Sequence, residues 1–96
     1  MDSTAVKSAI AEISPQLREL GVRSLSLFGS VARGEAQETS DLDMLVEFEG
    51  RATFSGYMDV KELLEQTLGR RVDLVTRRAV KPALRDRILG EAIRVA

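Results

Sequence analysis

The sequence contains no cysteine and no histidine. Without cysteine, disulfide bonds and thiolate-bound metals are excluded. Without histidine, the chain lacks the side chain that most often acts as a general base or binds a transition metal. A metal site in this protein must therefore be built from oxygen ligands, and such sites favour Mg²⁺, Mn²⁺ or Ca²⁺.

Aromatic residues make up only 4% of the chain, and the formal net charge is −1. Single-stranded nucleic acids need aromatic platforms on which bases stack, and phosphate backbones need an excess of positive charge. Both features argue against a nucleic-acid-directed transferase or binder, which the arginine-rich C-terminal segment would otherwise suggest. The sequence shows no signal peptide and no long apolar run, so we expect a soluble cytoplasmic protein that does not enter a membrane.

The length of 96 residues, with 44% apolar and 30% charged residues, fits one globular domain over residues 1–96. The sequence shows no internal repeat and no linker. A domain of this size has little surplus stability, so its size is compatible with a protein partner or a homodimer.

Opposite charges are concentrated in two parts of the chain. Residues 35–49 contain six acidic side chains and neither Lys nor Arg: Glu35, Glu38, Asp41, Asp43, Glu47 and Glu49. Residues 70–87 contain seven basic ones against two aspartates: Arg70, Arg71, Arg77, Arg78, Lys81, Arg85 and Arg87. A basic segment opposite an acidic site can guide a polyphosphate or an acidic partner, and a solvated helix face explains the same pattern equally well.

The apolar residues predict a helix followed by strands and further helices. One amphipathic stripe consists of Val6, Ile10, Ile13, Leu17 and Leu20, with Gly21 as its end and a kink predicted at Ser14-Pro15. Further predicted elements are a strand over 22–28, a helical turn at 30–33, a strand over 41–48, a loop at 54–56, a helix over 57–68, a strand over 71–75 and a helix over 82–90, with Leu84 and Ile88 facing inward. The tail, residues 92–95, either extends the last helix or forms a short strand.

This order predicts an α/β (α+β) domain, in which a small mixed β-sheet has helices packed mainly on one face. Asp41 and Asp43, two positions apart on a strand, would project from the other face about 7 Å apart. Such a pair can converge on one or two cations, and Mg²⁺ suits it because this ion completes its shell with water and phosphate oxygens. If the strand of Asp73 lies next to theirs, the three carboxylates form a cluster of the kind used in two-metal phosphoryl transfer.

Gly29 and Ser30 directly follow the first predicted strand. Glycine lets the backbone turn sharply and approach a ligand closely. Free N–H groups at the start of the helical turn, with the Ser30 hydroxyl, can hold phosphate oxygens. Arg33 would add positive charge for a triphosphate, and Ser40 could fix Asp41 or cap the loop. Taken singly, each of these residues is more often part of an ordinary helix start or a surface position. Only their combined order along the chain indicates a phosphate site.

Gly29-Ser30, ten intervening residues and Asp41-Leu-Asp43 resemble the GS-x10-D-x-D signature of the nucleotidyltransferase superfamily that includes DNA polymerase β. The context FGSVARGE…SDLDMLVEF resembles its smallest branch, the minimal nucleotidyltransferase (MNT) domains, and the resemblance covers nearly the whole chain. The segment RVDLV falls where the family has a third carboxylate, and KPALRDRIL resembles the family's end. The resemblance implies the polymerase β-like nucleotidyltransferase fold.

For the carboxylates, the resemblance implies a catalytic and metal-binding set of Asp41, Asp43 and Asp73. Asp41 and Asp43 would hold Mg²⁺, as one or two ions, together with a nucleoside triphosphate. Asp73 would bind metal or act as the base that helps activate an acceptor hydroxyl. That hydroxyl would attack the α-phosphorus and release pyrophosphate.

For the nucleotide, the resemblance implies that Gly29 and Ser30 hold the β- and γ-phosphates, with Arg33 and Ser40 as further contacts. The expected substrate is ATP. MNT proteins of this size are often encoded beside a HEPN-domain protein, a helical RNase toxin. The resemblance therefore implies an antitoxin that transfers AMP to a tyrosine of a HEPN toxin. The alternative is a non-catalytic, nucleotide-binding antitoxin that neutralises its partner by contact, and the acceptor stays open at this point between a protein tyrosine, a small molecule and an RNA end.

Overall fold

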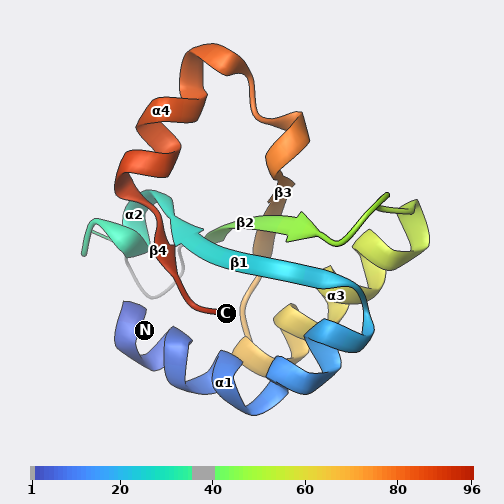
Figure 1. The fold of residues 1–96 in the computed structure, drawn as a ribbon. Helices are drawn as coiled ribbons and strands as arrows, with labels where there is room; N and C mark the ends of the chain where they lie inside the picture. The colour runs from blue at the N-terminus through green and yellow to red at the C-terminus, as the bar shows by residue number, and fades with distance from the viewer. Residues whose placement is uncertain (1, 36–40) are drawn as a thin grey trace.

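The computed structural model describes residues 2–35 and 41–96. Within these ranges, helices and strands follow one another around one sheet (Figure 1). In chain order they are α1 (Ser3–Glu19), β1 (Val22–Phe28), α2 (Gly29–Ala32), β2 (Leu42–Phe48), α3 (Phe54–Leu68), β3 (Val72–Thr76), the 3₁₀ turn η1 (Arg77–Ala79), α4 (Pro82–Glu91) and β4 (Ile93–Arg94). The predicted succession of elements is therefore confirmed, with η1 as an addition.

The sheet has four strands in the order β3-β2-β1-β4. β1 pairs antiparallel with β2 and with β4, whereas β2 and β3 run parallel. Parallel neighbours need a crossover connection, and α3 provides it. The sheet is therefore mixed and the fold is α+β, as the sequence predicted.

The core lies between the sheet and the helices α1 and α3, which cover the same face (Figure 1). Alternate strand residues point into it: Leu25, Leu27, Leu42, Met44, Val46, Val72 and Leu74. The two helices contribute Val6, Ile10, Leu17, Val60 and Leu64. Burial of each such side chain stabilises the fold by about 1.5–3 kcal/mol, so this face is fixed. The side chains between them must point to the opposite side, which we call the open face.

Helix α1 is continuous from Ser3 to Glu19, so the predicted second short helix after Ser14-Pro15 is wrong. The side chain of Asp2 caps its start by accepting a hydrogen bond from the N–H of Ala5 at 2.8 Å. Pro15 lies inside the helix and cannot bind the carbonyl of Ala11. Both residues are exposed, so this carbonyl is open to water and the helix continues through the proline.

Helix α3 begins at Phe54, so the predicted loop at 54–56 is also wrong. The hydroxyl of Thr53 accepts a hydrogen bond from the N–H of Gly56 at 3.0 Å. This N-cap satisfies one of the free donors of the first turn, and it outweighs the helix-breaking tendency of glycine. Gly69 ends the helix in a left-handed conformation, as predicted.

An arch of residues 77–91, formed by η1, the following turn and α4, spans the open face (Figure 1). No residue of α4 is buried, and Leu84, which we expected to face inward, is 46% exposed because the helix stands away from the core. The chain then re-enters the sheet as β4, which is one of the two predicted forms of the tail. Over residues 2–35 and 41–96, no helix combines the length and apolar character needed to cross a membrane.

Candidate functional site

Asp43 and Asp73 are register partners on the neighbouring parallel strands β2 and β3. The residues that precede them, Leu42 and Val72, are buried toward α1 and α3. Both carboxylates therefore point to the open face. The structure thus brings together two of the predicted site residues that lie thirty positions apart in the sequence.

The pKa of the Asp43 carboxyl is raised above its usual range. Burial is the largest cause, followed by the negative charges of Asp73 and Asp41, while Arg33 acts in the opposite direction. Crowded carboxylates disfavour each other's charged form. A bound cation would relieve this repulsion, so the raised pKa is a property expected of a metal-binding pair.

Asp41 is exposed and immediately precedes β2. Its negative charge contributes to the raised pKa of Asp43. Across the described residues, however, no three acidic side chains are grouped closely enough to hold a metal ion together. The fold therefore preassembles the pair of Asp43 and Asp73, and Asp41 must approach that pair if all three are to bind metal.

Gly29, the first residue of α2, is packed against Asp43. Its φ is +75°, a backbone conformation that costs other residues about 1–2 kcal/mol. A Cβ atom at this position would also collide with the carboxylate of Asp43. Glycine is therefore required for two reasons, and it places the start of α2 against the carboxylate pair.

The other residues predicted to contact phosphate are Ser30, Arg33 and Ser40. Ser30 is half-buried in the single turn of α2, and its carbonyl accepts a hydrogen bond from the N–H of Glu35 at 2.8 Å. Arg33 is exposed, and its guanidinium lies 3.1 Å from a carboxylate oxygen of Glu35 and 3.1 Å from one of Glu91. Ser40 lies outside the described residues.

Glu91, at the end of α4, is a site residue that the sequence analysis missed. Its Oε1 accepts a hydrogen bond from the backbone N–H of Gly29 at 3.2 Å, and both of its oxygens accept from Nη1 of Arg33, at 3.3 and 3.1 Å. These bonds, with that of Arg33 foremost, lower the pKa of Glu91. A carboxylate therefore already binds the groups that were predicted to hold phosphate. Because Gly29 and Glu91 are 62 positions apart, no local pattern in the sequence signals this contact.

The arrangement can bind a hard cation and an anion side by side. Carboxylate oxygens such as those of Asp43 and Asp73 are ligands that Mg²⁺ accepts. The N–H of Gly29 and the guanidinium of Arg33 suit an anionic ligand, and their bonds to Glu91 show that they bind a carboxylate. The residues present therefore fit a divalent cation that carries a phosphate-containing ligand.

Comparison with known proteins identifies relatives of this chain by sequence and by fold. Residues 10–95 match the family model of the nucleotidyltransferase domain. A candidate protein adenylyltransferase of Methanocaldococcus jannaschii is 45% identical over 84 residues, which cover 88% of this chain and 90% of that protein. The protein adenylyltransferase MntA of Thermococcus cleftensis is 40% identical over 91 residues, which cover 94% of this chain and 92% of that protein.

Solved structures share the fold over almost the whole chain. A candidate minimal nucleotidyltransferase has a TM-score of 0.84 at 42% identity, covering 97% of this chain and 95% of that one. A chain from the complex of the tri-AMPylated HEPN toxin of Shewanella oneidensis with an MNT antitoxin has a TM-score of 0.68 at 19% identity, covering 97% and 71%. The second likeness concerns the fold alone. On the family match and the two relatives, this chain belongs to the nucleotidyltransferase domain family, in its minimal form.

Proposed function

We propose that this protein is a protein adenylyltransferase that moves AMP from ATP to a hydroxyl group of a partner protein. The observation that carries the proposal is the pairing of Asp43 with Asp73 directly beside the Gly29 turn. In a member of the nucleotidyltransferase family, these groups are suited to bring the phosphates of a nucleotide and an acceptor hydroxyl together.

In this reaction the three carboxylates would bind metal or accept a proton. Asp41 and Asp43 would hold Mg²⁺, which when bound offsets the charge of the triphosphate and of the departing pyrophosphate. Asp73 would accept the proton of the acceptor hydroxyl or join the metal ligands. The hydroxyl oxygen forms a bond to the α-phosphorus as the bond to the β-phosphate oxygen breaks, and pyrophosphate leaves. Because the chain has no histidine, positioning and electrostatics would account for the rate.

The triphosphate would lie against the start of α2. Gly29 and Ser30 offer backbone N–H groups and a hydroxyl there, and Arg33 and Ser40 would be further contacts. Glu91 already binds Gly29 and Arg33, so phosphate oxygens must replace it or share these donors.

The proposed acceptor is a tyrosine of a HEPN toxin, which would make this protein the antitoxin of a toxin–antitoxin pair. Relatives at 45% and 40% identity carry names of protein adenylyltransferases, and this supports a protein as the acceptor. A fold neighbour comes from a complex of an MNT antitoxin with a tri-AMPylated HEPN toxin, and this supports the kind of partner.

A second candidate function is that of an antitoxin that binds a nucleotide and neutralises its partner by contact, without catalysis. One observation favours it. Among the described residues, no three acidic side chains form a ready metal site, which catalysis would need. In this case ATP would bind without being consumed.

Calorimetry tests the nucleotide site. ATP is titrated into the wild type and into Asp41→Asn/Asp43→Asn, with and without Mg²⁺. We expect binding that depends on Mg²⁺ in the wild type and no binding in the double variant. Asp59→Asn/Glu62→Gln changes the charge equally on the exposed side of α3 and should bind like the wild type. Undiminished binding by Asp41→Asn/Asp43→Asn would refute the site.

Transfer is tested by incubating the protein with Mg²⁺, ATP and a candidate HEPN-domain partner from the same genome, and by locating AMP on tyrosines by mass spectrometry. We expect the adduct with the wild type and a loss of about 100-fold or more in rate with Asp73→Asn, which is typical for removal of a general base. A wild type that silences the partner in a stable complex without any adduct would establish the second function instead.

A further inference from the structure

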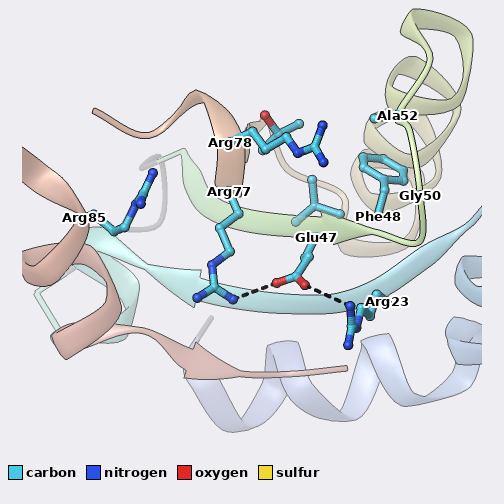
Figure 2. Close-up of a pocket in the computed structure, with 10 residues that line it drawn as sticks. Arg23, Glu47, Phe48, Gly50, Ala52, Arg77, Arg78 and Arg85 are labelled. Atoms are coloured by element: carbon cyan, nitrogen blue, oxygen red, sulfur yellow. Dashed lines mark hydrogen bonds and ion pairs between the residues drawn. The ribbon is translucent and has the colours of Figure 1, made fainter. Parts of the chain in front are cut away.

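A hollow of about 430 Å³ lies on the open face, between the strands and the arch of residues 77–91 (Figure 2). Its volume falls within the range of about 300–1,000 Å³ that ligand sites have. Its charged lining, which we call the basic hollow, consists of Arg23, Arg77, Arg78 and Arg85 against a single Glu47.

The charge of Glu47 is already matched within the hollow. Its Oε2 accepts a hydrogen bond from Nη1 of Arg77 at 2.8 Å, and its Oε1 lies 3.6 Å from Nη1 of Arg23. Figure 2 shows these two arginines meeting Glu47 from opposite sides. One carboxylate is therefore shared by two guanidinium groups.

Arg78 and Arg85 add positive charge that nothing in the described chain offsets. Both are exposed, and neither guanidinium forms a hydrogen bond or ion pair with a described residue. Arg85 lines the hollow from α4 and Arg78 from η1 (Figure 2). The hollow therefore has an unmatched positive charge and open donors on two of its walls.

The basic hollow and the carboxylate pair lie along the same strand. Glu47 is four positions beyond Asp43 on β2, which corresponds to about 13 Å at the rise of a strand. Leu45 and Val75, register partners on β2 and β3, lie between them, and Leu45 is buried while Val75 is half-buried. This stretch of the open face is as long as about four extended residues of a bound peptide.

We propose that the basic hollow binds an acidic segment of the protein that carries the acceptor hydroxyl, about four residues away from that hydroxyl. The inference rests on the proposed function and specifies its substrate: an extended segment with carboxylates at one end and a neutral hydroxyl at the other. Guanidinium groups bind carboxylates in planar, two-point geometry, so Arg78 and Arg85 suit this occupant.

Two features favour an acidic protein segment over a nucleic acid. The carboxylates of Asp43 and Asp73 at the other end of the stretch repel a phosphate backbone. Phe48 is the one aromatic side chain among the described lining residues, which provides no series of stacking platforms.

An NMR titration of the ¹⁵N-labelled protein with a hexaglutamate peptide tests the proposal. We expect shift changes at residues 23, 47, 77, 78 and 85 that weaken as salt is added, and none with hexaglutamine. Arg78→Gln/Arg85→Gln should weaken binding about tenfold, because two exposed charge pairs are lost. Both side chains are unpaired in the described chain, so this variant should keep its fold, which circular dichroism checks. Lys7→Gln/Arg18→Gln on α1 removes the same charge elsewhere and should bind like the wild type.

The transfer assay provides a second readout. Arg78→Gln/Arg85→Gln should raise the KM for the acceptor protein several-fold and leave the KM for ATP unchanged. Equal peptide binding by the two double variants would overturn the proposal, because binding would then depend on net charge alone. Loss of Mg²⁺-dependent ATP binding in Arg78→Gln/Arg85→Gln would also overturn it, since the hollow would then be part of the nucleotide site.

A second copy of this chain is a further occupant that the titration distinguishes. Shifts of the hollow residues that depend on protein concentration, without any peptide, would assign the hollow to self-association and overturn the proposal. Failure of the proposed function has a different signature: the wild type would then bind no ATP with Mg²⁺, whatever the peptide does.

Discussion

Glu91 in α4 accepts a hydrogen bond from the backbone N–H of Gly29 in α2, at 3.2 Å and across 62 positions of sequence. The same carboxylate pairs with Arg33 just after α2. Because α4 buries none of its own residues, its position depends strongly on this link between the arch and the sheet.

Glu91→Gln should loosen α4 without unfolding the domain. The amide is neutral, so it keeps the size of the side chain but loses the charge-assisted bonds to Arg33. We expect faster hydrogen exchange of the α4 amides and unchanged exchange of β1 and β2, measured by mass spectrometry. Glu62→Gln on α3, an exposed change of the same kind, should alter neither. Unchanged exchange in α4 would show that other contacts hold the arch.

The link should also respond to pH. Hydrogen bonds from Arg33 and then from Gly29 keep the pKa of Glu91 below its usual value of 4.5. The stabilisation is therefore complete above the ordinary pKa of Glu and is lost as the pH falls through the lowered value. An NMR titration that follows the side-chain carboxyl carbon of Glu91 should show its transition below pH 4.5. A transition at or above that value would contradict the bonding described.

Glu91→Gln should bind ATP several-fold more tightly than the wild type. The substitution removes a negative charge from the donors proposed to hold phosphate, and it weakens the competition for Gly29 and Arg33. Calorimetry with Mg²⁺ and ATP measures the change. Weaker binding would mean that Glu91 positions Arg33 for the nucleotide instead of competing with it.

Gly29→Ala should destabilise the protein more than Gly34→Ala does. Both glycines have positive φ, +75° and +73°, so both substitutions incur backbone strain of about 1–2 kcal/mol. Only at position 29 would the new Cβ also collide with Asp43, whereas at position 34 it meets no atom of the described residues within 4 Å. Urea denaturation followed by circular dichroism gives both free energies of unfolding. Equal losses would mean that the packing of Gly29 on Asp43 is not tight.

Asp43→Asn should stabilise the protein when divalent cations are chelated. The amide removes repulsion among Asp41, Asp43 and Asp73, which contributes to the raised pKa of Asp43. We expect a Tm a few degrees higher, since about 1 kcal/mol shifts the Tm of a domain of this size by about 4–8 °C. Added Mg²⁺ should raise the Tm of the wild type and leave the variant unchanged in scanning calorimetry. A lower Tm of the variant with cations chelated would show that favourable contacts hold the Asp43 carboxylate.

The polar face of β2 was predictable because strand side chains alternate. Met44 and Val46 face the core while Asp43 and Glu47 face away, and the sequence shows this directly. The sequence predicted that Asp43 and Asp73 lie side by side only if their strands are neighbours. Whether β2 and β3 are neighbours depends on how α3 carries the chain across the core.

Three predictions were wrong. Leu84 was expected to face inward but is exposed, because α4 stands away from the core. The other two concern helices α1 and α3, where local signals compete. Pro15 was expected to disturb α1, but its position on the exposed side removes most of the cost. Residues 54–56 were expected to be a loop, but the hydroxyl of Thr53 caps the helix there. The first outcome depends on where the fold places Pro15, and the second on a local cap between Thr53 and Gly56.

The contacts between the arch of residues 77–91 and the sheet could not be predicted. Glu91 reaches Gly29 only because the arch closes over the open face. The basic hollow likewise combines Arg23 of β1, Glu47 of β2 and Arg85 of α4, which share no local pattern. A charge-rich segment in the sequence thus predicts neither its partner nor the shape of the surface it forms.

The thin shape of this domain has a consequence for timing. Its shortest dimension is 18 Å, and α1 and α3 wall off only one side of the sheet. A reaction on the other side would proceed in contact with bulk water, which weakens electrostatic effects and competes with the acceptor as a nucleophile. We therefore expect the free protein to be a slow ATPase at most, and the arriving acceptor protein to supply the missing wall. The acceptor protein would then complete the active site that modifies it, and ATP would be consumed mainly when the two proteins meet.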